Sequence, residues 1–137
     1  MEPAQALADL VEISSQIEAV VLVEGDGSVV ASTLADAAKA GALAAVAQDV
    51  VARAEAVAAG RDVTQVEVSL AEGSVFAVRS GPRTILATTR PDPTVGLVLY
   101  DLRSCLRNAA VAPEAKPKRA RAKKPAAPPE GGGDAAA

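Results

Sequence analysis

The segment from Ile17 to Ser32 constrains the fold of this chain more than any other segment. Residues 19–23 are continuously apolar and rich in β-branched side chains, a pattern typical of a strand that is covered on both faces and lies centrally in a sheet. Gly25-Asp26-Gly27 then provides the backbone freedom for a tight hairpin turn, and residues 28–33 predict a returning antiparallel strand. An antiparallel sheet is therefore expected in the core.

A long helix is expected over residues 36–59, where Ala fills about half of the positions and Gly60 ends the pattern. Its larger apolar residues recur at spacings of 3, 4 and 7, and we expect this stripe to face the sheet. The stripe comprises Leu43, Val46, Val50 and Val57. Alanines such as Ala45 and Ala52 extend low-polarity surface around the helix, which indicates a second contact surface, although helix propensity alone is an alternative explanation.

Two shorter helices and three further strands complete the predicted fold. The first helix follows Pro3, and its apolar face comprises Leu7, Leu10 and Val11. The strands are expected at residues 63–70, 74–79 and 84–89. After a Pro-rich break, the last helix carries Val95, Leu99, Leu102 and Leu106 on one face. This order predicts an α+β fold, a five-stranded antiparallel sheet with one long helix on one face and two helices on the other.

The composition excludes most familiar catalytic and metal sites. The chain has no His, no Trp and a single Cys, so His-dependent triads and thiolate or imidazole zinc sites cannot form. Residues 24–27 match no phosphate-binding loop, and Glu67 and Glu72 are expected on exposed positions where nothing shifts their pKa. Cys105 is expected to be a small core residue. We therefore predict no catalytic residue, no cofactor and no metal, and a protein that is not an enzyme.

Charge divides the chain into two regions. Residues 1–112 carry 8 basic and 14 acidic side chains, whereas residues 113–137 carry 6 basic and 3 acidic ones. We expect one folded domain over residues 1–111 and a disordered tail rich in Ala, Pro, Lys and Arg over residues 112–137. The N-terminus lacks the pattern of a signal peptide and no apolar run is long enough to span a bilayer, so a cytoplasmic location is expected.

The basic tail supports an alternative function. Its cations are Lys116, Lys118, Arg119, Arg121, Lys123 and Lys124. They could contact nucleic-acid phosphates or an anionic surface weakly and without sequence preference, as in a sensor or a nucleoid-associated protein. The alternative is that they form a solvated linker, since no aromatic residue interleaves them for base stacking.

Two short motifs and the order of elements resemble the roadblock family, dynein-light-chain-like regulators of small GTPases. The hairpin from Gly25 to Ser32 resembles the family turn D-G-x-x-x-A-S, and residues 94–99 resemble the small-residue start of its last helix. Residues 17–19 depart from the family, because many members have a Pro-Gly pair there. A profilin-like or longin-like sheet sandwich would share much of this pattern. The resemblance implies a non-catalytic homodimeric scaffold that binds a Ras-like small GTPase and modulates its nucleotide cycle or localisation.

The predicted interface is formed by the long helix and strand 63–70. Polar and apolar residues alternate cleanly along this strand, which suits a sheet edge that pairs with its copy. The helix contributes Leu43, Ala45, Val46, Gln48, Asp49, Val50, Ala52, Arg53 and Val57, and the strand contributes Val66 and Val68.

Overall fold

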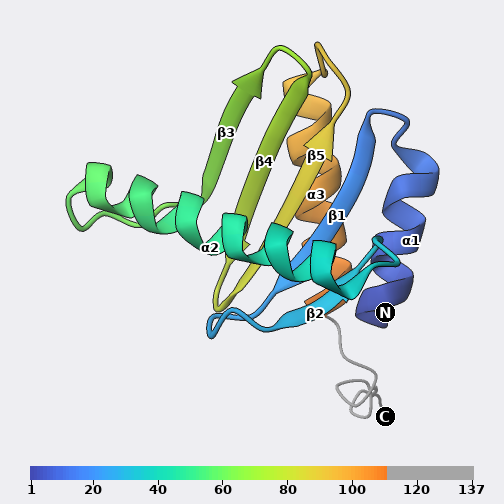
Figure 1. Ribbon diagram of the computed structural model, residues 1–137, viewed down its shortest axis with the longest axis horizontal. Helices are drawn as coiled ribbons and strands as arrows, with labels where there is room; N and C mark the ends of the chain where they lie inside the picture. Colours follow the sequence, from blue (N-terminus) through green and yellow to red (C-terminus); the bar gives the residue numbers. More distant parts are fainter. Residues whose placement is uncertain (111–137) are drawn as a thin grey trace, which may run out of the picture.

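The computed structural model describes residues 1–110, which fold into a five-stranded antiparallel sheet between two helical layers (Figure 1). In chain order the elements are α1 (Pro3–Ile13), β1 (Ile17–Val23), β2 (Val29–Ser32), α2 (Ala37–Ala58), β3 (Gln65–Leu70), β4 (Gly73–Ser80), β5 (Arg83–Thr89) and α3 (Val95–Ala110). The strand order across the sheet is β2-β1-β5-β4-β3. Helix α2 covers one face, and α1 and α3 cover the other. The predicted fold class and element order are confirmed.

Strand β1 is buried on both faces, as its apolar run predicts. Val20, Val21, Leu22 and Val23 have no exposed surface. The strand pairs with β2 on one side and with β5 on the other, so it is an inner strand, although β5 rather than β1 lies in the middle of the sheet. In the loop that follows β1, Gly27 has a φ of +91°, which other residues rarely adopt. The predicted hairpin is therefore present.

Two cores of different composition lie on the two faces of the sheet. The α1/α3 side holds the bulkier side chains, among them Leu7, Phe76, Ile85 and Leu102. On the α2 side the sheet contributes Val21, Val23, Ala77 and Leu86, and the helix contributes Ala44, Ala47 and Val51. Because these α2 residues are small, the helix axis can lie close to the strands. Among residues 1–110 no helix is both long and apolar enough to cross a membrane.

Cys105 lies in the core between α3 and α1. Its thiol is buried and donates to the Ala6 carbonyl oxygen at 3.5 Å. Burial raises the pKa of this thiol to about 11, with a smaller contribution from the negative charge of Asp9. The group therefore stays protonated at neutral pH, and the prediction of a small core residue is confirmed.

Gly73 fixes the point at which β3 turns into β4. It has a φ of +149°, and a Cβ atom added there would lie 2.0 Å from the Thr89 carbonyl oxygen. No larger residue fits this approach of β4 to the end of β5. The same turn determines where the edge strand β3 ends.

Candidate functional site

The face of α2 that meets the sheet is built from small residues. Its buried positions are Ala40, Ala44, Ala47 and Val51. The predicted sheet-facing stripe of Leu43, Val46, Val50 and Val57 is therefore wrong: Leu43 is partly buried against the core, Val50 is half-buried, and 42% of Val46 and 85% of Val57 are exposed. The physical reason is packing distance, because an alanine stripe lets the helix lie closer to the strands than a valine stripe would.

The larger residues form a second stripe, about a quarter of a turn around α2 from the buried one at 3.6 residues per turn. Contacts on the opposite flank orient this second stripe. There Gln48 Nε2 donates to the Gly25 carbonyl oxygen at 3.3 Å, and Glu55 pairs with Arg79 at 2.5 Å. Both contacts lie on the side of the β1–β2 and β4–β5 turns. The Leu43 to Val57 stripe therefore faces the other way, toward the part of the sheet that α2 leaves uncovered (Figure 1).

Strand β3 lies at the edge of the sheet, as its alternation predicts. The Arg79 N–H donates to the Thr64 carbonyl oxygen at 2.9 Å, so the backbone groups of Thr64 point toward β4. Because these directions alternate along a strand, Gln65, Glu67 and Ser69 direct their N–H and C=O groups outward from the edge. The edge therefore offers a template for another strand.

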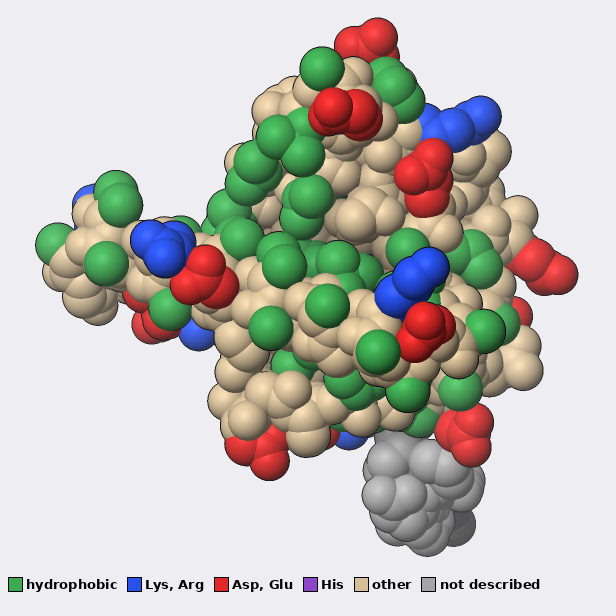
Figure 2. Space-filling model, in the orientation of Figure 1, with side chains coloured by type: hydrophobic (Ala, Val, Ile, Leu, Met, Phe, Trp, Pro, Cys, Tyr) green, Lys and Arg blue, Asp and Glu red, His purple; other side chains and the backbone are tan. Residues whose placement is uncertain are grey.

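The side chains of β3 add an apolar strip to the same face as α2. Val66 packs against the α2-side core, while 38% of Val68 and 54% of Leu70 are exposed. Figure 2 shows hydrophobic side chains gathered on this face, along α2 and over the neighbouring strands. We name this region the α2–β3 surface, and it comprises Leu43, Val46, Val50, Val57, Val66, Val68, Leu70 and Val75.

Helix α2 extends beyond the edge of the sheet. Its last turns project past β3, and no strand within residues 1–110 lies beneath them (Figure 1). Val57 lies in this projecting part, which accounts for its large exposed fraction. Val57 thus continues the exposed apolar stripe of α2 past the edge of the sheet, and a contiguous exposed apolar patch is typical of an interaction surface.

Of the other predicted interface residues, Arg53 lies beside the Val46–Val57 stripe, one turn after Val50 and one turn before Val57, and Asp49 lies next to it on the solvent side. Asp49 and Arg53 form an exposed ion pair with each other at 2.9 Å, and Gln48 is engaged with the β1–β2 loop. Ala45 and Ala52 are exposed, but helical geometry puts them on the side of α2 away from the Val46–Val57 stripe. The structure thus brings together the apolar members of the prediction. It also adds Leu70 and Val75, and the alternation of β3 could have identified Leu70.

The described fold contains no cluster of carboxylates suited to binding a metal. Residues 1–110 hold no group of three or more His, Cys, Asp or Glu side chains able to bind a metal together. Asp26 is exposed and accepts from the Ser28 hydroxyl and N–H, at 2.6 and 2.9 Å. These two hydrogen bonds lower the pKa of Asp26, which stabilises the turn in its ionised form. Glu67 and Glu72 are both exposed.

The basic cluster proposed for nucleic-acid or surface contact begins at Lys116. It lies outside the described residues, as does the tail predicted to begin at residue 112.

Comparison with known proteins places this geometry in a family. The family model for the Roadblock/LC7 domain matches residues 3–90. A Roadblock/LC7 domain from Streptomyces avermitilis superposes with a TM-score of 0.70 at 19% identity, over 79% of this chain and 94% of that one. The gliding protein MglB from Thermus thermophilus superposes with a TM-score of 0.68 at 13% identity, over 83% of this chain and 90% of that one.

Profilin from Schizosaccharomyces pombe shares the fold more loosely. Its TM-score is 0.52 at 14% identity, over 77% of this chain and 94% of that chain. No curated protein sequence matches the chain significantly. The family match covers more than half of the sequence and includes α1, the whole sheet and α2. The chain therefore belongs to the Roadblock/LC7 domain family.

Proposed function

We propose that this protein is a homodimer, formed through the α2–β3 surface, that binds a Ras-like small GTPase and modulates its nucleotide cycle or localisation without catalysing a reaction itself. The observation that carries the proposal is the exposed apolar strip of α2 and β3, beside an edge of β3 with which no other strand of residues 1–110 pairs. Fully burying one Val or Leu side chain stabilises a complex by about 1.5–3 kcal/mol, so such a strip favours association. Membership of the Roadblock/LC7 domain family supports the GTPase part of the proposal, because the resemblance to this family implies a regulator of small GTPases.

The unpaired edge restricts how two copies can pair. Outward backbone groups belong to Gln65, Glu67 and Ser69, so only these residues can form hydrogen-bonded pairs with a second antiparallel β3. An axis that brings at least two of these residues into pairing passes beside Glu67, Val66 or Val68. An axis at Glu67 would place two carboxylates face to face, which is destabilising.

Apolar complementarity selects between the two remaining axes. With the axis at Val66, the half-exposed Leu70 would lie opposite Asp62 of the partner subunit. With the axis at Val68, Val68 meets its own copy and Val66 meets Leu70 of the partner subunit. We therefore place the axis at Val68. The projecting end of α2 then extends over the partner's sheet, where Val57 is covered.

A cysteine at position 68 tests this arrangement. Residues opposite each other in a non-hydrogen-bonded antiparallel pair have Cα atoms about 4.5 Å apart, within disulfide range. Val68→Cys should form a covalent dimer under mild oxidation, measured on a non-reducing gel. Val29→Cys, on the other edge strand β2, should give no covalent dimer on the same gel, and Cys105 is too buried to interfere. A cross-link from Glu67→Cys but none from Val68→Cys would contradict the register.

Binding and turnover assays test the regulatory role. Purified full-length protein is mixed with each Ras-like GTPase of the same organism, loaded with GDP or with a non-hydrolysable GTP analogue. We expect binding that depends on the nucleotide, an altered rate of GTP hydrolysis or nucleotide exchange, and no hydrolysis by this protein alone. The absence of binding in both nucleotide states would refute the GTPase assignment and leave the dimer to be judged by the cross-link.

A further inference from the structure

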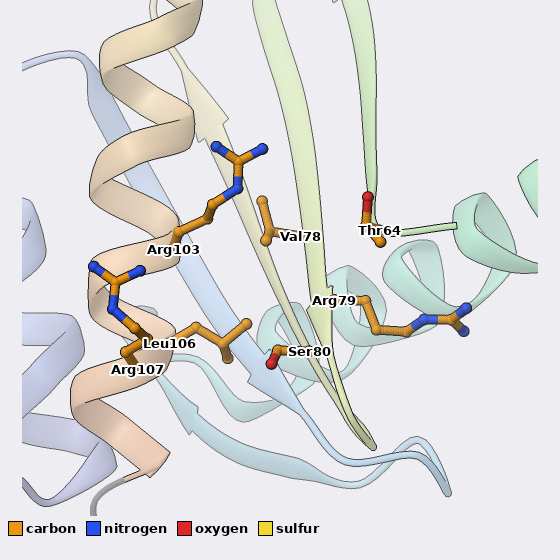
Figure 3. A pocket seen from close by; sticks show the side chains of 7 residues that line it. All are labelled: Thr64, Val78, Arg79, Ser80, Arg103, Leu106 and Arg107. Carbon is orange, nitrogen blue, oxygen red and sulfur yellow. The ribbon is translucent and has the colours of Figure 1, made fainter. Parts of the chain in front are cut away.

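A hollow of about 270 Å³ lies on the face of the sheet opposite α2, between α3 and the end of β4 (Figure 3). Its apolar floor is formed by Val78 and Leu106, Ser80 brings a hydroxyl group to its margin, and Thr64 also lines it. Arg103 and Arg107 border it from α3. Arg79 also contributes to the lining, but its side chain points away from α3 and pairs with Glu55 near α2.

The two arginines of α3 have no carboxylate partner within residues 1–110. The three ion pairs found there involve Arg53, Arg79 and Arg83. Arg103 instead donates to Gln65 Oε1, and Arg107 donates to the Ser104 hydroxyl at 3.2 Å. Like charges one helical turn apart repel each other. The helix dipole accounts for a cation at Arg107, in the last turn, but not for Arg103, seven residues before the end of α3.

We propose that this hollow binds a carboxylate side chain of an extended acidic peptide from a partner protein. The carboxylate would accept paired hydrogen bonds from the Arg103 guanidinium group. Arg107, whose side chain lies along α3 in Figure 3 and donates to the Ser104 hydroxyl, would turn toward the carboxylate as a second donor. An aliphatic neighbour of the acidic residue would pack on Val78 and Leu106. The apolar floor favours a peptide over a free phosphate ion, which has no apolar surface to bury.

The proposal is independent of the dimer and of the GTPase. The hollow faces away from the α2–β3 surface, so a dimer formed through that surface would carry two copies of it. Acidic peptides are also the partners that the local charge selects, because residues 1–112 are otherwise dominated by acidic side chains and would repel them elsewhere.

NMR titration of the full-length protein tests the assignment. The probe is the peptide acetyl-Leu-Asp-Leu-Glu-Leu-amide, and its matched control carries Asn and Gln in place of Asp and Glu. We expect the acidic peptide to shift the Arg103 and Arg107 Nε–H signals and the Val78 and Leu106 methyl signals. The amide peptide should bind more weakly by about tenfold, since both charge-assisted contacts are lost.

Single charge removals identify the site. Arg103→Gln and Arg107→Gln keep a good helix former and should each weaken acidic-peptide binding about threefold, as expected for partly exposed ion pairs. Arg61→Gln, an exposed arginine just after α2, should leave binding unchanged. Any one of four results would overturn the proposal. These are equal binding of both peptides, no shift of these signals, no effect of either substitution, and shifts caused by inorganic phosphate but not by the acidic peptide.

Discussion

Val51→Asp is expected to unfold the domain, whereas Val50→Asp leaves it folded. Val51 is buried between α2 and the sheet, in the same cluster as Ala47 and Leu86. A carboxylate there would lose its water without gaining a partner, at a cost of several kcal/mol against a total stability of about 5–15 kcal/mol. Circular dichroism during urea titration should show the loss of helix and sheet signal in Val51→Asp.

The neighbouring substitution is the control. Val50 has the same side chain, one position earlier along the helix, but it is only half-buried and lies on the second stripe. Its carboxylate keeps water, so the monomer should unfold at nearly the wild-type urea concentration. If the two variants exchange behaviour, so that Val50→Asp unfolds and Val51→Asp does not, the orientation of α2 described above is incorrect.

Val68→Lys should convert the dimer into a folded monomer and abolish any effect on a GTPase that needs the dimer. The substitution occurs twice at the proposed axis, where it sets two ammonium groups opposite each other and removes apolar contact from both copies. We expect the dimer dissociation constant to rise by roughly 100-fold or more, consistent with several kcal/mol for like charges at an interface. Sedimentation velocity from micromolar concentration upward measures this change.

The second edge strand provides a matched comparison. Val29 lies in β2 and is 40% exposed, close to the exposure of Val68, so Val29→Lys adds the same charge to the other edge of the same sheet. It should leave the sedimentation coefficient at the wild-type value. A dimer that survives Val68→Lys but is lost in Val29→Lys would assign the interface to β2.

Local sequence patterns were sufficient to predict the fold and the edge position of β3. The continuous apolar run of β1 requires cover on both faces, and the alternation of β3 is typical of a strand with one face exposed. Glycine placement then marks the turns. These features depend on neighbours in the sequence, so they can be identified without knowing how the layers pack.

The orientation of α2 could not be predicted in the same way. The helix carries two apolar stripes, one through Ala44, Ala47 and Val51 and the other through Val46, Val50 and Val57, and periodicity alone allows either to face the sheet. Hydrophobicity favours the valines, whereas close packing favours the smaller residues. Likewise Arg103 and Ser80 are 23 positions apart in the sequence, and only the crossing of α3 over β4 brings them to one hollow. The choice of helix or strand along this chain therefore follows from local patterns of residues. Which side chains are buried, and which remain for partners, depends instead on the distances between packed layers, and those distances exist only once the chain has folded.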